Sequence, residues 1–507
     1  MDNAALHHDF FLLLPEVQLV LFGLGILLTD FLLEDQYKYW NAVMALLGVA
    51  FSGFSLWRLR DLPPDASVAF HYSILVDPFY IFFGALFLAA TALVILLSVK
   101  YLSTVGENHG EYYALLLFAT VGMMFMAAGI DLVVQFLGLE TMALSFYVLV
   151  GFLRRDKRSN EAAVKYFLLG AFSSGILAYG FSLLYGISAT ADLKDLFGPD
   201  VPRTSLAAVN AAVQIMVDQH GAGILLVMLA LVTVAVGLFF KVAAVPFHQW
   251  APDVYEGAPT TITAYVSVAS KTASFALLLR LFLTAFWPAR VNWEMILVGV
   301  AVASLTLGNF AALTQTNVKR MLAYSSISHV GYILLGLVAG NETGLVGISY
   351  YLMVYVFMTA GAFGVLIVLQ RRGLAGDELD DLNGLYRRSP VAALLLLIFM
   401  LSLAGIPPLA GFMGKYFIFL ALIQAQHYTL AVFAALYIVP ALYYYFRVVV
   451  HAWLKDGTDH SRVPISMAQT IAMTVMCFVT LAAGIYPEPF VHLAGYSIFL
   501  PLGPFGH

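Results

Sequence analysis

The sequence is short of charge. Asp, Glu, Lys and Arg make up 11 % of its 507 residues, against about 25 % in a soluble domain. Hydrophobic residues make up 61 %, and the mean hydropathy is +0.88. Too little polar surface remains to cover a soluble globule, whereas apolar runs of the ~20 residues that cross a bilayer follow one another almost end to end. The sequence therefore predicts an all-α polytopic membrane protein.

Cysteine is nearly absent. The single Cys477 excludes a disulfide within the chain, a cysteine-ligated zinc site and a cysteine-held iron–sulfur cluster on this chain alone. No Gly-rich phosphate or dinucleotide loop stands between a strand and a helix. No His, Asp and Glu cluster has convincing metal spacing, and nothing resembles a dedicated quinone headgroup site. We therefore expect no metal and no cofactor on this chain.

A basic N-terminal stretch is also missing, since the chain begins with Asp2 and Asp9 in its place. The first apolar run is therefore expected to remain as a membrane helix. Hydropathy predicts about fourteen spans, the twelfth of which is long because Gly405, Pro407 and Pro408 interrupt it. The spans cover roughly residues 10–33, 39–57, 78–99, 112–129, 132–152, 162–186, 221–245, 261–284, 293–314, 322–339, 345–369, 390–423, 428–450 and 466–485.

The positions of the 25 Lys and Arg residues predict an orientation, because basic residues concentrate in cytoplasmic loops. With both termini outside, the basic residues on the inner side are Lys38, Lys100, Arg154, Arg155, Lys157, Arg158, Lys319, Arg320, Arg371, Arg372, Arg387, Arg388, Arg447, Lys455 and Arg462. Those outside are Arg58, Arg60, Lys194, Arg203, Arg280 and Arg290. The bias favours fourteen helices with both termini on the outer, periplasmic side of a bacterial inner membrane.

The remaining basic residues, Lys165, Lys241, Lys271 and Lys415, lie inside spans. A lysine at the bilayer centre costs about 2.5–3.5 kcal/mol on insertion scales, so these side chains must face protein or water, as residues of ion and proton pathways do. Desolvation lowers the pKa of a lysine and a nearby carboxylate raises it, so a Lys–Glu pair can hold or release a proton as its geometry changes. For Lys165, which follows Glu161 by one turn, the alternative is snorkelling to the interface.

Acidic residues are rarer still within the spans. Glu140 is the only carboxylate that we place well inside one, whereas Asp30, Asp77, Asp131 and Glu161 sit near helix ends. Glu140 on the fifth span is the expected partner of a lysine on the sixth or seventh. The alternative is that it merely neutralises such a lysine.

Two spans are expected to be broken beside a lysine. Pro246 follows Lys241 closely, and proline lacks an N–H and clashes with the carbonyl four residues back. The Gly405–Pro407–Pro408 segment likewise precedes Lys415. Freed backbone groups at membrane depth need protein or water beside them. The breaks are five spans apart, which indicates two inverted five-helix repeats (spans 4–8 and 9–13) with a site at their interface; the alternative is two unrelated kinks.

Two histidines are candidates for the same path. His329 follows a serine-rich run inside the tenth span, and its titration near neutrality suits a relay. A hydrogen-bonded packing histidine is the alternative. His248 follows the Pro246 break and is expected near water at the inner side.

Three segments resemble a known family, the antiporter-like membrane subunits of proton-pumping NADH:quinone oxidoreductase (respiratory complex I, NDH-1). They are Phe247-His248-Gln249-Trp250-Ala251-Pro252-Asp253-Val254-Tyr255-Glu256-Gly257-Ala258-Pro259, Lys319-Arg320-Met321-Leu322-Ala323-Tyr324-Ser325-Ser326-Ile327-Ser328-His329 and Ala404-Gly405-Ile406-Pro407-Pro408. The resemblance runs from about the fourth span to the thirteenth. It implies fourteen helices and two inverted repeats, each forming a half-channel that ends at the membrane midplane.

The resemblance also implies roles. Glu140 is similar to the family's helix 5 glutamate, Lys241 to its helix 7 partner and Lys271 to the central helix 8 lysine. Lys415 is similar to the helix 12 residue that leads outward, Lys165 to a basic position of the N-type subunit, and His329 to the link between halves. A lysine at 415, an end soon after the last span, and Asp-Val-Tyr-Glu-Gly-Ala-Pro are most similar to N-type members.

The expected function is that of a proton-translocating subunit of NADH:quinone oxidoreductase, with residues 1–110 (helices 1–3), 111–285 and 286–455 (the repeats) and 456–507 (helix 14) as its parts. NADH, FMN, iron–sulfur clusters and quinone would lie in or between other subunits. The expected partners are M-type and small membrane subunits, the peripheral redox arm and the bilayer, without nucleic acid. Alternatives are a subunit of a multisubunit sodium/proton antiporter, a related ferredoxin- or hydrogenase-linked pump, and a structural or lipid-handling membrane protein.

Overall fold

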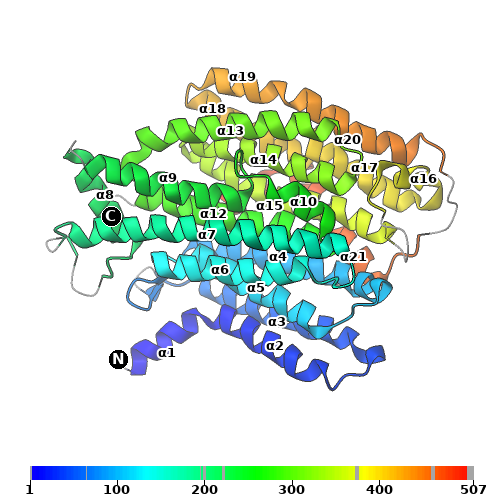
Figure 1. Ribbon diagram of the computed structural model, residues 1–507, viewed down its shortest axis with the longest axis horizontal. Coiled ribbons are helices and arrows are strands. Elements are labelled where there is room, and N and C mark those ends of the chain that lie inside the picture. Colours follow the sequence, from blue (N-terminus) through cyan, green and yellow to red (C-terminus); the bar gives the residue numbers. More distant parts are fainter. Residues whose placement is uncertain are drawn as a thin grey trace.

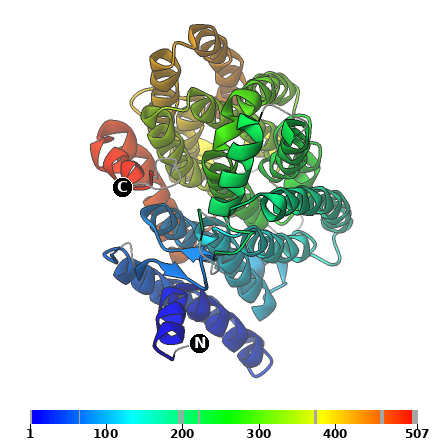
Figure 2. The same cartoon turned by 90° about the vertical axis from the view of Figure 1, so that its left-hand side faces the viewer.

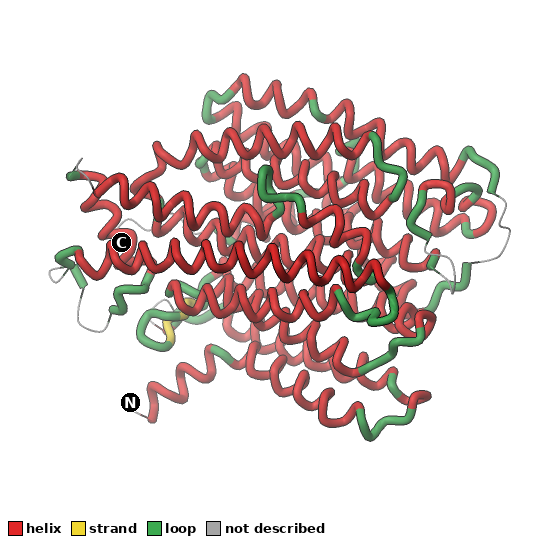
Figure 3. Tube along the Cα trace, in the orientation of Figure 1, coloured by secondary structure: helices red, strands yellow, loops and turns green. Residues whose placement is uncertain are grey.

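The computed structural model describes residues 3–63, 66–193, 196–197, 201–219, 223–370, 376–457 and 463–498. Lys194, Arg371, Arg372 and Arg462, which entered the predicted orientation, lie outside these residues. Long helices run side by side through the molecule (Figure 1). Apart from helices and loops, the described residues form one short pair of strands (Figure 3).

The elements are, in chain order, α1 (Asn3–Leu12), α2 (Leu14–Asp30), η1 (Asp35–Tyr37), α3 (Tyr39–Leu59), β1 (Val68–Ala69), β2 (Ile74–Leu75), α4 (Pro78–Val105), α5 (Gly110–Ala128), α6 (Leu132–Val150), α7 (Lys157–Thr190), α8 (Leu206–Asp218), α9 (Gly223–Val242), α10 (Trp250–Gly257), α11 (Thr260–Tyr265), η3 (Val266–Ser270), α12 (Lys271–Arg280), η4 (Leu281–Ala285), η5 (Trp287–Ala289), α13 (Arg290–Leu313), α14 (Val318–Ala339), α15 (Glu342–Leu369), η6 (Leu379–Leu382), α16 (Leu385–Arg388), α17 (Pro390–Ala404), α18 (Ala410–Gln424), α19 (Tyr428–Leu436), α20 (Ile438–Trp453), α21 (Met467–Ile485) and α22 (Glu488–Tyr496).

Twelve helices of the described chain are long and apolar enough to cross a membrane. A further candidate is the pair α1–α2, which bends by 71°. The shorter apolar helices include α17 and α18, the two parts of the predicted twelfth span. The predicted class, an all-α polytopic membrane protein, is confirmed.

The helices differ in how deeply they are buried. All residues in the apolar core of the Thr260–Ala285 segment are buried, as are 94 % of those in α14 and in α15. In the end-on view, α1–α3 form one edge of the molecule and α19–α20 the opposite edge (Figure 2). The central helices therefore provide surroundings in which side chains meet protein and not lipid.

Tight turns at helix ends are fixed by local chemistry. α5 and α6 are separated by three residues, and the Asp131 carboxylate caps α6 by accepting the N–H groups of Val133 and Val134. The same turn extends the two-stranded sheet, since Ile74 of β2 pairs with Gly129. In the sheet, Val68 faces Leu75 and Ala69 faces Ile74, antiparallel.

The structure contains both interruptions beside a lysine. α9 ends at Val242 and α10 begins at Trp250, with Pro246 between them. α17 ends at Ala404 and α18 begins at Ala410, with Gly405, Pro407 and Pro408 between them. Gly405 adopts φ +86°, the left-handed conformation that favours glycine at a helix C-terminus.

Three charged side chains are buried at positions where the sequence did not predict burial. Arg280, placed on the outer side by the orientation, is 2 % exposed, and Lys319, placed on the inner side, is 4 % exposed. Glu16, near the start of the first predicted span, is 2 % exposed. Hydropathy gives the depth of a residue along a helix, but not whether its side chain turns toward lipid, water or a neighbouring helix.

Candidate functional site

Lys241 lies in the last turn of α9, 3 % exposed. Its ammonium donates a hydrogen bond to Ser174 Oγ at 3.3 Å and lies 5.9 Å from the ring centroid of Tyr147. The break that follows gives the freed backbone new partners. Trp250 Nε1 donates to the carbonyl of Phe240 at 2.8 Å, one residue before Lys241.

Glu140 of α6 lies near Lys241 but does not touch it. Its charge acts on Lys241 electrostatically, yet no ion pair within 4.0 Å joins the two among the described residues. Glu140 Oε1 is buried and has no hydrogen-bond partner among the residues that the structure describes. The predicted partners therefore interact electrostatically, but they do not form an ion pair in this structure.

Lys271 follows directly on the π-helical turn η3 and is 2 % exposed. Its ammonium donates to Ser326 Oγ of α14. Ser326 in turn shares a hydrogen bond of 2.6 Å with the hydroxyl of Tyr355. π-Helical turns often mark functional sites, because they rotate the helix and re-aim the side chains that follow.

His329 lies within electrostatic reach of both Lys271 and Lys415. The ring is 3 % exposed and bonded at both nitrogens: Nδ1 to the hydroxyl of Tyr351 at 2.6 Å and Nε2 to that of Tyr445 at 3.1 Å. Each hydroxyl can donate or accept, so the histidine has a hydroxyl partner on either side.

Lys415 lies at the second break, 3 % exposed. Its ammonium donates to the carbonyls of Leu403 at 3.1 Å and Ala404 at 2.8 Å. These belong to the last turn of α17, whose carbonyls have no partner within the helix and form the negative end of its dipole. The break thus supplies a binding site for a cation. The ring of Tyr332 lies 5.2 Å from the same ammonium.

Lys165 does not belong to this buried row of Lys241, Lys271, His329 and Lys415. Its side chain is 43 % exposed and pairs with Glu161 at 2.8 Å and Asp253 at 2.9 Å. Asp253 also pairs with Arg320. Burial opposes ionisation of Asp253, but hydrogen bonds from Lys165 and Arg320 outweigh it and hold the pKa of the carboxyl below its ordinary value. These residues line a polar hollow of about 260 Å³.

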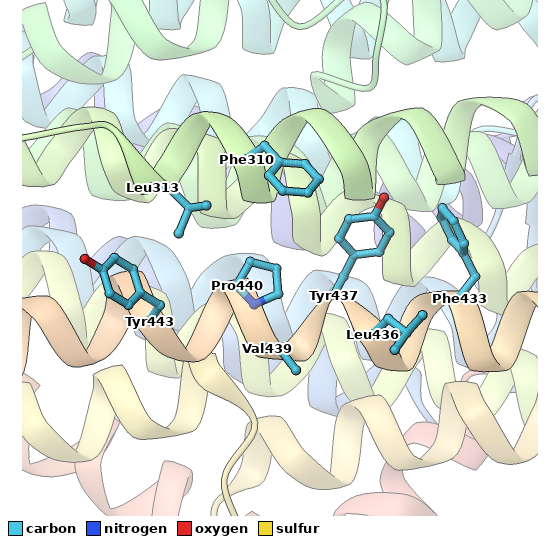
Figure 4. A pocket seen from close by; sticks show the side chains of 8 residues that line it. All are labelled: Phe310, Leu313, Phe433, Leu436, Tyr437, Val439, Pro440 and Tyr443. Atoms are coloured by element: carbon cyan, nitrogen blue, oxygen red, sulfur yellow. The ribbon is translucent and has the colours of Figure 1, made fainter.

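His248 is half-buried in the loop between α9 and α10, two residues after the exposed Pro246. Within the described residues, its ring makes no hydrogen bond to Lys241 or Lys271. A separate apolar hollow lies between α13 and α19–α20, lined by Phe310, Leu313 and Tyr437 among others (Figure 4). No charged side chain lines that hollow.

The hydroxyl partners of the row were not identified from the sequence. Ser326 stands in the serine-rich run before His329, which was the one available signal. Tyr351, Tyr355 and Tyr445 are far from His329 along the chain and read as ordinary core aromatics. Only the packing of α14, α15 and α20 brings them to the imidazole.

Fold and site together define a class: a polytopic helical membrane protein with ionisable side chains buried between helices, two of them at helix breaks. Such residues mark ion and proton pathways in membrane proteins. The chain belongs to the NADH:quinone oxidoreductase/Mrp antiporter transmembrane family, whose sequence model matches residues 129–439.

Individual relatives are similar over nearly the whole chain. NADH-quinone oxidoreductase subunit N 2 of Solibacter usitatus (strain Ellin6076) is 51 % identical over 499 residues, covering 97 % of this chain and 98 % of that protein. NADH-quinone oxidoreductase subunit N 1 of Koribacter versatilis (strain Ellin345) is 51 % identical over 511 residues, covering 99 % and 97 %. A chain of respiratory complex I from Thermus thermophilus with bound aureothin superposes with a TM-score of 0.74 at 31 % identity, covering 95 % and 99 %.

Proposed function

We propose that this chain is the N-type, antiporter-like membrane subunit of a bacterial NADH:quinone oxidoreductase and that it moves protons along the buried row. The observation that carries the proposal is the row itself: Lys241, Lys271, His329 and Lys415, each 2–3 % exposed. Hydroxyls or freed carbonyls contact every member. Burying these groups is costly, and translocation is the function that requires them.

The proposed architecture has fourteen spans, in which α17–α18 and α19–α20 each count as one. Residues 111–285 and 286–455 form two inverted five-helix repeats, preceded by three helices in 1–110 and followed by the last in 456–507. The two interruptions, five spans apart, support this division. Each repeat would contribute a half-channel, meeting near Lys271 and His329.

In this mechanism, the chain's residues hold and pass protons without redox chemistry of their own. Glu140 approaching Lys241 favours the ammonium, and its withdrawal favours proton release toward Lys271. His329 then passes the proton between Lys271 and Lys415. Lys165 and His248 would connect the row with the inner aqueous phase, the side on which the basic loops concentrate.

The driving reaction is proposed to occur in other subunits. NADH, FMN, iron–sulfur clusters and quinone would bind in or between them; the relatives are named as subunits of an NADH-quinone oxidoreductase. M-type and small membrane subunits and the peripheral arm would be its partners, in the bacterial inner membrane with both termini on the outer side.

Purification through a tag on this chain tests the assembly. Recovery of flavin and iron–sulfur subunits with NADH:quinone activity is expected. Recovery of small membrane subunits alone, without redox activity, would contradict the assignment and favour a sodium/proton antiporter.

Proton movement is tested by replacing Lys271 with methionine, which keeps the aliphatic length and removes the charge. We expect an assembled complex with NADH-driven proton uptake into inverted vesicles reduced at least about tenfold. The control is Lys157→Met at an exposed position on α7, which should pump normally. Normal pumping by assembled Lys271→Met would contradict the role of the row.

A further inference from the structure

A buried carboxylate lies far from the row, in the first three helices. Glu16 is the third residue of α2, just after the 71° bend from α1, and it is 2 % exposed. Oε1 accepts a hydrogen bond of 2.6 Å from the hydroxyl of Tyr80 in α4. Oε2 is buried and has no hydrogen-bond partner among the described residues.

Among the described residues, no counter-charge reaches this carboxyl, because no basic group lies within 4.0 Å of it. Arg58 in the last turn of the neighbouring α3 and Arg60 just after its end are exposed, and they lie against the rings of Phe11 and Trp57. Arg280, at the end of α12, is bound to Asp77.

Tyr80 is the titratable side chain that hydrogen-bonds to Glu16 among the described residues. On α1, His7 is exposed and His8 hydrogen-bonds to the carbonyl of Ala66. On α5, which packs against α2, the titratable side chains are in the first four residues: Glu111, Tyr112 and Tyr113. The opposite end of α2 carries Asp30, which pairs with Lys38.

An ionised carboxylate buried without a counter-charge is far more costly than a neutral one. We propose that Glu16 is a proton-binding site, separate from the lysine row, that carries its proton on Oε2 in the resting protein. Tyr80 then donates to Oε1, the carbonyl oxygen, so that the carboxylic acid keeps its one hydrogen bond. The ligand of the site is a single proton. Residues of this chain alone bury the Glu16 side chain and so favour its protonated form.

The site touches the ion pair at the end of α12. The Tyr80 backbone N–H donates to Asp77 at 2.9 Å, and Asp77 accepts two bonds from Arg280, at 2.7 and 2.6 Å. Arg280 lies on the same helix as Lys271. Tyr80 therefore contacts the Glu16 carboxyl through its hydroxyl and this ion pair through its backbone N–H. This proposal does not depend on the proposed function, because it concerns the protonation of one carboxyl.

Infrared difference spectroscopy between variants of the purified complex tests it, because a protonated carboxyl group has a carboxylic-acid C=O band that a carboxylate lacks. Near neutral pH we expect the carboxylic-acid band of Glu16 in the wild type to be lost in Glu16→Gln. The control is Glu161→Gln at an ion-paired surface position, which should leave the band in place. A carbonyl region unchanged by Glu16→Gln would overturn the proposal.

A second variant covers the case in which Glu16→Gln fails to assemble. Tyr80→Phe removes the hydrogen bond to Oε1, and a carbonyl that loses a hydrogen bond absorbs at higher frequency. We expect the band to shift upward in Tyr80→Phe and to stay in place in Tyr350→Phe, a matched buried tyrosine on α15. An unshifted band in Tyr80→Phe would contradict a protonated Glu16.

Discussion

The step through His329 can be tested by removing one hydroxyl. Tyr351→Phe keeps the ring, 0 % exposed, and deletes the group bonded to His329 Nδ1 at 2.6 Å. If His329 passes protons between Lys271 and Lys415, this change leaves an imidazole nitrogen buried without a partner. We therefore expect proton transfer to slow at this position.

The magnitude follows from the cost of an unsatisfied buried polar group, about 1–3 kcal/mol. If that cost falls on the barrier to proton transfer, the rate drops about 5- to 150-fold, since ~1.36 kcal/mol is tenfold in rate. The assay is the initial rate of NADH-driven proton uptake into inverted membrane vesicles per assembled complex, with NADH:quinone turnover measured alongside.

Tyr350→Phe is the matched control. Tyr350 is the preceding residue of α15, equally buried, and its hydroxyl donates to the carbonyl of Ala483, away from His329. The two variants should lose similar thermal stability, but only Tyr351→Phe should lose pumping. Wild-type pumping by assembled Tyr351→Phe would refute the relay through His329, as would an equal loss in Tyr350→Phe.

Three further predictions concern the break, a buried cation and acid stability. In Gly405→Ala the new Cβ would lie 3.0 Å from Lys415 Nζ, and alanine would have to adopt the left-handed φ of +86°. Pumping should therefore fall, and stability should drop by about 1 kcal/mol or more. The control is Gly299→Ala, whose Cβ meets nothing within 4 Å and which should leave thermal unfolding and pumping nearly unchanged. Arg280→Gln leaves a partly buried carboxylate unpaired, at a cost of about 3–5 kcal/mol, so the yield of assembled complex should fall sharply, and a normal yield on native gels would contradict this. The pKa of Asp253 is held below its ordinary value. The ionised carboxylate therefore stabilises the fold at pH values above the ordinary pKa, and this stabilisation is lost as pH falls through the lowered pKa. Asp253→Asn should make thermal stability in detergent fall less steeply at acidic pH, and an unchanged pH dependence would show that the ion pairs contribute nothing.

The sequence was sufficient for features that depend on one segment at a time. A lysine in an apolar run indicates an energetically costly buried charge, and Pro246 or the Pro407–Pro408 pair indicates an interrupted helix. The class of the fold follows from the same local information. The sequence therefore predicted that Lys241, Lys271 and Lys415 would not face lipid, and the structure buries all three side chains.

Features that depend on two distant segments were not predictable. Asp77 and Arg280 are 203 residues apart, and each looked like an interfacial residue at a span end. Glu16, close to Pro15 near the start of a span, was likewise overlooked as a buried acid. Lys165 shows the converse, since its span predicted burial, yet its side chain turns to the ion pairs with Glu161 and Asp253. Rotation about the helix axis decides these cases, and a uniformly apolar helix gives no periodic signal from which to read it.

The row has a property that bears on how its members communicate. Lys241, Lys271 and Lys415 lack a carboxylate within 4.0 Å among the described residues; they are held by a hydroxyl or by carbonyl dipoles. Two ammonium groups even 10 Å apart repel by about 1.7 kcal/mol at an effective dielectric constant of 20. Protonating one lysine therefore favours deprotonating the next, and the carboxylate of Glu140 can shift that balance from one end by closing its gap to Lys241. Coupling along the row then requires no unbroken chain of hydrogen bonds, only charges close enough to compete and a partner whose distance changes.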